Sequence, residues 1–153
     1  MKIFFYFILT LLPYTGFATE QSPLIEENDF QQLSQQMKEK NRGLLLMFHA
    51  EHCPYCARME KEILAPMVIS GEYDDRIFIR KLQIDEARNI KDFEGKTVEP
   101  SDVSDKYKAR LTPTLVFLDH KGEEKAKKMV GINTVELFGA YLDAEIDQLM
   151  QNL

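Results

Sequence analysis

Residues 44–56 read Leu-Leu-Leu-Met-Phe-His-Ala-Glu-His-Cys-Pro-Tyr-Cys, an apolar run followed by two cysteines that are separated by two residues. The apolar run predicts a buried strand, and the pattern of residues 57–64 predicts a helix directly after the cysteines. Pro54 suits the first turn of that helix, because its missing N–H group would have no partner there in any case. The stretch therefore places two sulfur atoms together at the start of a helix.

These are the only two cysteines in the chain. A bridge that closes so short a loop removes little entropy from the unfolded state, so a structural staple explains the pair poorly. Thiol chemistry explains it better, because the free N–H groups and the positive end of the helix favour a thiolate at the first sulfur. We expect any further lowering of the Cys53 thiol pKa to come from the Cys56 thiol, from the amides of Tyr55 and Cys56, or from His52 when it is protonated. We expect Cys53 to attack a partner and Cys56 to resolve the mixed disulfide.

The rest of the chain predicts an α/β sandwich around a small mixed sheet. The expected elements are a helix capped by Asp29, a strand over 77–84, an inserted surface loop over 86–100, a short helix capped by Ser101, a hairpin over 115–130 that turns at Gly122, and a last helix capped by Thr134. Pro66 should break or kink the helix that follows the cysteines.

The first 18 residues have the three parts of a secretory signal: a basic start at Lys2, an apolar run over 3–12 and small residues at Gly16 and Ala18. We expect cleavage after Ala18, which leaves 19–153 as one domain in the periplasm or outside the cell. A retained anchor is the alternative, but the run is shorter than the roughly 20 residues that a bilayer span needs.

The chain has 153 residues, 19 basic and 25 acidic, with a net charge of −6. Loss of a leader containing Lys2 makes that charge one unit more negative, which argues against a nucleic-acid partner. The length suits a single core. Oxidising compartments preserve disulfides, which agrees with an exported protein that works through its cysteines.

Three separated motifs resemble the thioredoxin fold. They are the strand, Cys53-Pro54-Tyr55-Cys56 and helix, then Lys81-Leu82-Gln83-Ile84-Asp85, and finally Leu111-Thr112-Pro113-Thr114-Leu115-Val116-Phe117 with a later Gly131. The resemblance implies a central mixed sheet flanked by helices, with the 86–100 insertion before a strand that begins at a cis Thr112–Pro113 bond. It also implies that Thr112, Pro113, Pro54 and Tyr55 contact an extended substrate segment. Within the family, the chain is most similar to exported thioredoxins of the SoxW type.

The sequence departs from the family pattern next to the dithiol. Thioredoxins place a buried Asp on the strand before the motif, where it takes the proton of the resolving thiol, and here that position is Met47. Positions that commonly hold Trp are His49 and His52. One hypothesis is that His49, or a water near Lys81, takes over the proton transfer. The alternative is that His49 is a packed, half-buried imidazole that does not titrate.

The resemblance implies a thiol–disulfide oxidoreductase without a cofactor. Its expected partners are protein disulfides or dithiols, with a membrane thiol transporter as candidate electron donor, and reduction is favoured over isomerisation. Copper or zinc delivery is a rival function, because His49, His52, Cys53 and Cys56 are suitable ligand types. Their crowding argues against joint ligation, so no metal site is assigned. A redox-silent binding module is the second rival, and the presence of both cysteines argues against it.

Overall fold

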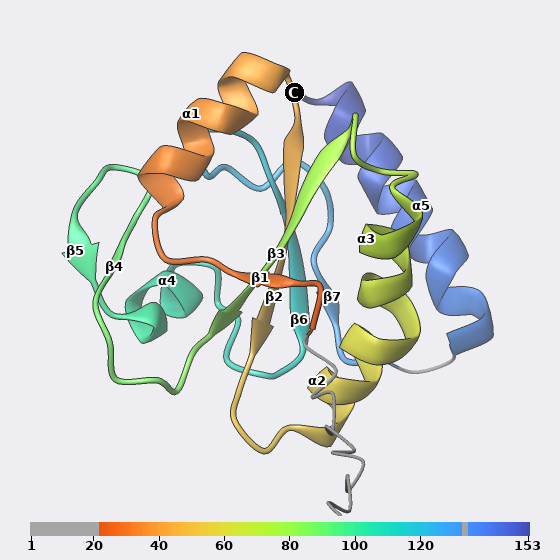
Figure 1. Ribbon diagram of the computed structural model, residues 1–153, viewed down its shortest axis with the longest axis horizontal. Coiled ribbons are helices and arrows are strands. Elements are labelled where there is room, and N and C mark those ends of the chain that lie inside the picture. Colours follow the sequence, from red (N-terminus) through yellow and green to blue (C-terminus); the bar gives the residue numbers. More distant parts are fainter. Residues whose placement is uncertain (1–21, 133–134) are drawn as a thin grey trace, which may run out of the picture.

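The computed structural model describes residues 22–132 and 135–153, and it has a thioredoxin fold with a central sheet between two layers of helices (Figure 1). The sheet has the strand order β1-β3-β2-β6-β7. Strands β1, β3 and β2 are parallel, whereas β6 is antiparallel to β2 and β7 to β6. The strand bounds are Ile25–Glu26 for β1, Gly43–His49 for β2, Ile77–Gln83 for β3, Thr114–Leu118 for β6 and Met129–Val130 for β7.

Strand β2 occupies the centre of the sheet and is buried from Gly43 to Phe48. Side chains alternate across a strand, so Met47 packs in the core on one face and Leu46 in the core on the other. Helices cover both faces of the sheet, so side chains on either side of β2 are buried. The strand is therefore apolar at successive positions rather than at every second position. The strand predicted at 44–49 is confirmed, and it delivers the dithiol loop to one edge of the sheet.

One face of the sheet is covered by α1 (Phe30–Lys40), α4 (Pro100–Lys106) and a small hairpin (Figure 1). The predicted cap of α1 is confirmed, since Asp29 accepts a hydrogen bond from the Gln32 N–H at 2.8 Å. The apolar side chains predicted at helical spacing are buried: Phe30, Leu33 and Met37. The helix ends at Asn41, which adopts the left-handed conformation.

The segment predicted as a surface loop is more ordered than expected. Within 86–100, β4 (Ile90–Lys91) pairs with β5 (Thr97–Val98), and Ile90 is buried in the core beneath α1. Strands of two residues are too short to give a periodic pattern. The predicted cap at Ser101 is wrong, because α4 begins at Pro100 and Glu99 takes the cap position. Pro54 and Pro100 thus both stand where a helix starts.

The other face is covered by a continuous helical segment and by α5 (Val135–Gln151) (Figure 1). The segment consists of α2 (Pro54–Met59), the π-helical turn η1 (Glu60–Leu64) and α3 (Ala65–Ser70). The helix was expected to break or kink at Pro66; it does not break there, but a π turn interrupts its α-helical hydrogen bonding just before the proline. In an α-helix the proline ring clashes with the carbonyl four residues earlier; the wider π turn, in which the Ala65 N–H reaches the Glu60 carbonyl, provides room for it.

The last helix has the predicted apolar stripe, with Phe138, Leu142, Ile146 and Leu149 buried against the sheet. The predicted Thr134 cap lies outside the described residues. Gly43 is required where α5 crosses the start of β2, because a Cβ atom there would overlap the Leu149 side chain. The predicted hairpin turn is confirmed, and Gly122 has φ +74°.

Candidate active site

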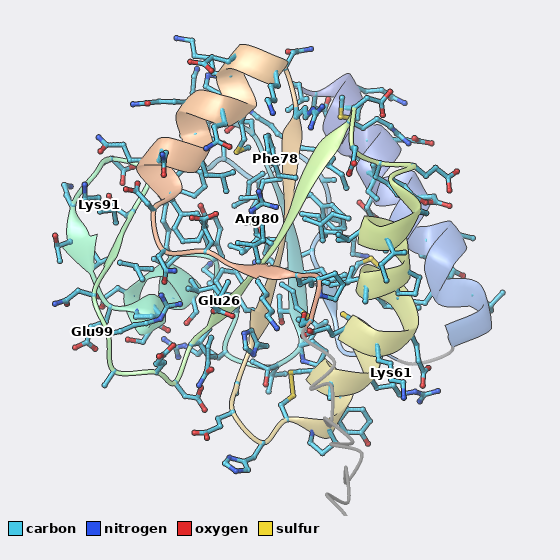
Figure 2. The ribbon with its side chains drawn as sticks, viewed as in Figure 1. Glu26, Lys61, Phe78, Arg80, Lys91 and Glu99 are labelled. Carbon is cyan, nitrogen blue, oxygen red and sulfur yellow. A yellow bond between two sulfur atoms is a disulfide. The ribbon has the colours of Figure 1, made fainter. Side chains whose placement is uncertain are left out.

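Cys53 and Cys56 form a disulfide at the start of α2, drawn as the yellow bond at the lower end of the sheet in Figure 2. Their Cα atoms lie 5.2 Å apart. Cys53 is the N-cap residue, and its Sγ accepts a hydrogen bond from the Cys56 N–H at 3.2 Å. Cys53 is partly exposed, whereas Cys56 is only 4% exposed. A protein partner can therefore reach the Cys53 sulfur, and the roles of attacking and resolving thiol stay predictions.

The loop before β6 faces the disulfide. The Thr112–Pro113 bond is cis, as the resemblance implies, and the Thr112 hydroxyl lies 3.6 Å from the Cys53 sulfur. Pro113 is buried and its carbonyl accepts a hydrogen bond from the Gly131 N–H at 2.8 Å. Tyr55 and Leu111 flank the site with 62% and 70% exposure. The partly exposed Cys53 sulfur thus lies beside the Thr112 hydroxyl, and exposed apolar side chains stand next to both residues in the sequence.

An open hollow of about 480 Å³ lies beside the disulfide. It brings together the predicted supporting residues and one that was not predicted; its polar lining is His49, His52, Cys53, Cys56, Glu60 and Lys81. Lys81 is far in sequence from the residues at 49–60. It reaches the same hollow because β2 and β3 are adjacent parallel strands that end together. The pairing of these two strands therefore places Lys81 beside the dithiol loop.

Lys81 and Glu60 form an ion pair across the hollow. The Lys81 Nζ lies 2.9 Å and 3.0 Å from the two carboxylate oxygens of Glu60, and the two side chains are 15% and 19% exposed. Lys81 is the register partner of Met47 on the neighbouring strand, so both side chains point to the same face of the sheet. A carboxylate therefore does lie near the dithiol, and it comes from the helix rather than from β2.

A second carboxylate network surrounds His49. The His49 Nε2 lies 2.8 Å from Glu26 Oε2, and Glu26 Oε1 accepts hydrogen bonds from the Gln83 N–H and from Arg88, the latter at 3.2 Å. Burial raises the pKa of Glu26, but the His49 and Gln83 hydrogen bonds and the nearby charge of Arg88 outweigh it and hold the pKa below its usual value. Figure 2 labels Glu26 on β1. His49 is thus tied to a neighbour, with 14% of its side chain exposed.

His52 and Asp85 belong to the loop that carries Cys53. The His52 side chain is 87% exposed, and its backbone has a φ of +54°. Asp85, the acid at the end of the second motif, accepts hydrogen bonds from the Glu51 N–H at 3.0 Å and 3.1 Å. This backbone hydrogen bond lowers the pKa of the Asp85 carboxyl. The motif acid therefore anchors the dithiol loop to the end of β3.

Neither Glu60 nor Glu26 is among the site residues predicted from the sequence. Glu60 follows Cys56 by four residues, a spacing that puts two side chains on the same side of a helix, so the signal was present in the sequence. Glu26 carried no such signal, because β1 has only two residues and its partners are fixed by strand pairing. Register decides which side chains meet across a sheet, and register is not readable from one short segment.

A family model described as a thioredoxin-like domain matches residues 30–146 of this chain. The chain belongs to the thioredoxin-like domain family. The matched range contains both cysteines and the Thr112–Pro113 bond. In general terms, a thioredoxin-like domain with this cysteine pair indicates a thiol–disulfide oxidoreductase.

Solved structures of thioredoxins share the fold of this thioredoxin-like protein. Thioredoxin of Fasciola hepatica aligns with a TM-score of 0.55 and 18% identity, over 82% of this chain and 98% of that one. Oxidised mitochondrial thioredoxin 3 of Saccharomyces cerevisiae aligns with a TM-score of 0.54 and 20% identity, over 80% and 99%. No curated protein matches the sequence. These likenesses establish the fold and leave substrates open.

Two further findings concern membranes and metals. Over residues 22–132 and 135–153, no helix has both the length and the apolar composition for crossing a bilayer.

Within the same ranges, no three His, Cys, Asp or Glu side chains are grouped so that they could hold a metal ion. His49 contacts Glu26 and His52 projects from the loop.

Proposed function

We propose that this thioredoxin-like protein is an exported thiol–disulfide oxidoreductase that reduces, or isomerises, disulfides of envelope proteins. The observation that carries the proposal is the pairing of one accessible sulfur with one buried sulfur beneath the Thr112–Pro113 loop. The accessible Cys53 sulfur can form a disulfide with a partner. The buried Cys56 sulfur, which the partner cannot reach, can then attack Cys53 and break that disulfide. This is the division of labour that dithiol exchange requires.

The exchange proceeds in two steps that conserve electrons. The Cys53 thiolate attacks one sulfur of a partner disulfide, forms a mixed disulfide and releases the other partner sulfur as a thiolate. Cys56 then loses its proton and attacks the Cys53 sulfur, which releases the second partner thiolate. The Cys53–Cys56 bond forms, the partner disulfide is reduced, and a donor dithiol must later reduce the protein again. The Cys56 N–H and the Thr112 hydroxyl, both near the Cys53 sulfur, stabilise its thiolate.

Export and direction rest on the sequence. The leader-like residues 1–18 support secretion, and a membrane thiol transporter is the proposed electron donor. The assignment to the SoxW type is supported by the leader-like residues, the Cys53-Pro54-Tyr55-Cys56 motif, the acidic helix after it and the insertion over 86–100. We favour reduction of envelope partners over oxidation, and N-terminal sequencing of the protein from cell fractions tests the location: a periplasmic form that starts after Ala18 supports export, and a full-length cytoplasmic form contradicts it.

Reduction of insulin by the protein, with dithiothreitol as electron source, tests the activity. The parent should accelerate the reaction, and the Cys53→Ser and Cys56→Ser variants should give the background rate. Metal analysis of the reduced protein tests the rival function. A stoichiometric copper or zinc ion that survives dialysis, together with no insulin reduction, would overturn the proposal in favour of metal delivery.

Partner capture in the exporting organism then addresses the substrates. Cys56→Ser should accumulate mixed disulfides through Cys53, and mass spectrometry should identify them. The redox state of the captured cysteines before reaction gives the direction of electron flow. The absence of any mixed disulfide, in a variant shown to be folded and exported, would argue for a redox-silent module.

A further inference from the structure

Resolution of the mixed disulfide needs a proton acceptor for Cys56, because only a thiolate attacks. Strand β2 offers none at the expected position: Met47 is fully buried, and it packs among apolar side chains that include Met59 and Leu115. An ionised group placed there would have to lose its hydration without a partner. The acceptor must therefore come from another element.

Glu60 is the carboxylate on the helix that carries Cys56. It follows Cys56 by one turn, and its backbone N–H bonds to the Cys56 carbonyl, so the two side chains share one side of the helix. Both residues line the hollow beside the disulfide. Lys61, labelled in Figure 2, is exposed on the outer side of the same turn. Of these two neighbours, only Glu60 lines the hollow beside the dithiol.

Lys81 fixes the position of Glu60. Its Nζ contacts both carboxylate oxygens, and it also lies 3.4 Å from the Ser22 hydroxyl. Lys81 is thus a positioning residue, and its long side chain can follow the carboxylate as its charge changes.

Other titratable groups face the same hollow. They are His49 at the end of β2, His52 in the loop and the two cysteines at the start of α2. His49 is engaged with Glu26 at 2.8 Å, and His52 is 87% exposed and lies 3.8 Å from Glu51. Glu60 differs from the two histidines, because its ion-pair partner, Lys81, also lines the hollow.

We propose that Glu60, held by Lys81, accepts the proton of Cys56 when Cys56 resolves the mixed disulfide. The proton moves from the Cys56 sulfur to the Glu60 carboxylate, and the Cys56 thiolate forms a bond to the Cys53 sulfur. The bond between Cys53 and the partner breaks, and the partner sulfur leaves with the electron pair. Glu60 then returns its proton to the solvent or to the leaving thiolate. This role rests on the proposed function.

The reaction of the reduced protein with dithiobis-nitrobenzoate separates the two steps. Attack by Cys53 releases one coloured thiolate, and resolution by Cys56 releases a second, so rapid mixing gives two phases. For Glu60→Gln we expect an unchanged first phase and a second phase about a hundredfold slower near pH 6.5, at the low end of general-base effects. Its rate should rise about tenfold per pH unit up to the ordinary thiol pKa of about 8.5.

Matched variants identify the group responsible. Glu62→Gln, on the same turn but paired with Arg58 at the surface, should behave as the parent, and Glu60→Asp should retain part of the fast second phase. A second phase in Glu60→Gln with the rate and pH profile of the parent would overturn the proposal, as would a loss confined to His49→Ala. A parent protein that releases only one thiolate would contradict the dithiol exchange itself, so the two failures are distinguishable.

Discussion

Glu60 and Glu26 are two carboxylates on the same face of the sheet, and the structure treats them differently. Glu26 has three partners, since it contacts His49, the Gln83 N–H and Arg88. Glu60 has one side-chain partner, Lys81, and faces the hollow beside the dithiol. Three partners from three segments fix the position of the Glu26 carboxylate, whereas the Glu60 carboxylate is held by one flexible side chain.

Glu26 therefore has a structural role, whereas Glu60 is the carboxylate that we propose to take part in the reaction. Glu26 joins β1 to β2 and β3 and resists protonation, because its hydrogen bonds lower its pKa. Glu60 lies one helical turn from the buried thiol and contributes little to the sheet. Substitution of Glu26 should therefore affect stability, and substitution of Glu60 should affect the rate of thiol exchange.

The largest expected effect on stability comes from placing a carboxylate at position 47 of β2, where thioredoxins have an Asp. Met47→Asp should lower the free energy of unfolding by about 3–5 kcal/mol at neutral pH, because the new charge is buried while Lys81 is already paired with Glu60. The loss should shrink as the pH falls, since burial raises the pKa of the new acid and its protonated form costs less to bury. Urea denaturation measures both.

Met47→Leu is the control for this change, because it conserves volume and should cost less than about 1.5 kcal/mol. If Met47→Asp unfolds at the same urea concentration as Met47→Leu at neutral pH, Lys81 is free to pair with β2, and the assignment of Lys81 to Glu60 is wrong.

Glu26→Gln should lower the free energy of unfolding by about 1–3 kcal/mol, because Arg88 and His49 lose a charged acceptor in a partly buried network. The second phase of thiolate release should stay within about twofold of the parent. Chemical denaturation gives the first quantity and rapid mixing the second. A slow second phase in a stable variant would show that the two carboxylates act as one unit.

His49→Ala should have a smaller effect, a loss of about 1 kcal/mol, because it removes one hydrogen bond from Glu26 and leaves the other two. The pH dependence of insulin reduction should match the parent. A changed profile at unchanged stability would instead support the hypothesis that His49 transfers the proton.

The smallest expected effect is on how the free energy of unfolding depends on pH in the acidic range. The folded-state pKa of Glu26 lies below its unfolded value of 4.5, so its contribution to stability is present above pH 4.5 and is lost as the pH falls through the folded pKa. Glu26→Gln should therefore show a shallower loss of stability below pH 4.5 than the parent. Urea denaturation at several pH values measures the difference, and identical slopes would mean that Glu26 has the same pKa in both states.

The fold was predictable because its central signals are local. The apolar run of β2, the Asp29 cap and the stripe of α5 each act within one element, and the order of the motifs indicated the family. What the sequence did not reveal depends on pairing between elements. The β4–β5 hairpin, the π turn that accommodates Pro66 and the Glu60–Lys81 ion pair all require a neighbour whose position is set by tertiary packing.

The candidate site was predictable in part for the same reason. Cys53 and Cys56 share one turn, so their geometry follows from their spacing. His49 and Lys81 were singled out as supporting residues, but their partners Glu26 and Glu60 were not, because a side chain on a strand meets its partner only when the register is known.

Capture of a mixed disulfide tests the central claim most directly. The reduced Cys56→Ser and Cys53→Ser variants are each mixed with a peptide disulfide, and the adducts are located by mass spectrometry of the intact and digested protein. The exposed position of Cys53 and the burial of Cys56 predict rapid, stable accumulation of an adduct on Cys53 and almost none on Cys56. Equal accumulation on both, or a preference for Cys56, would contradict the assignment of Cys53 as the attacking thiol.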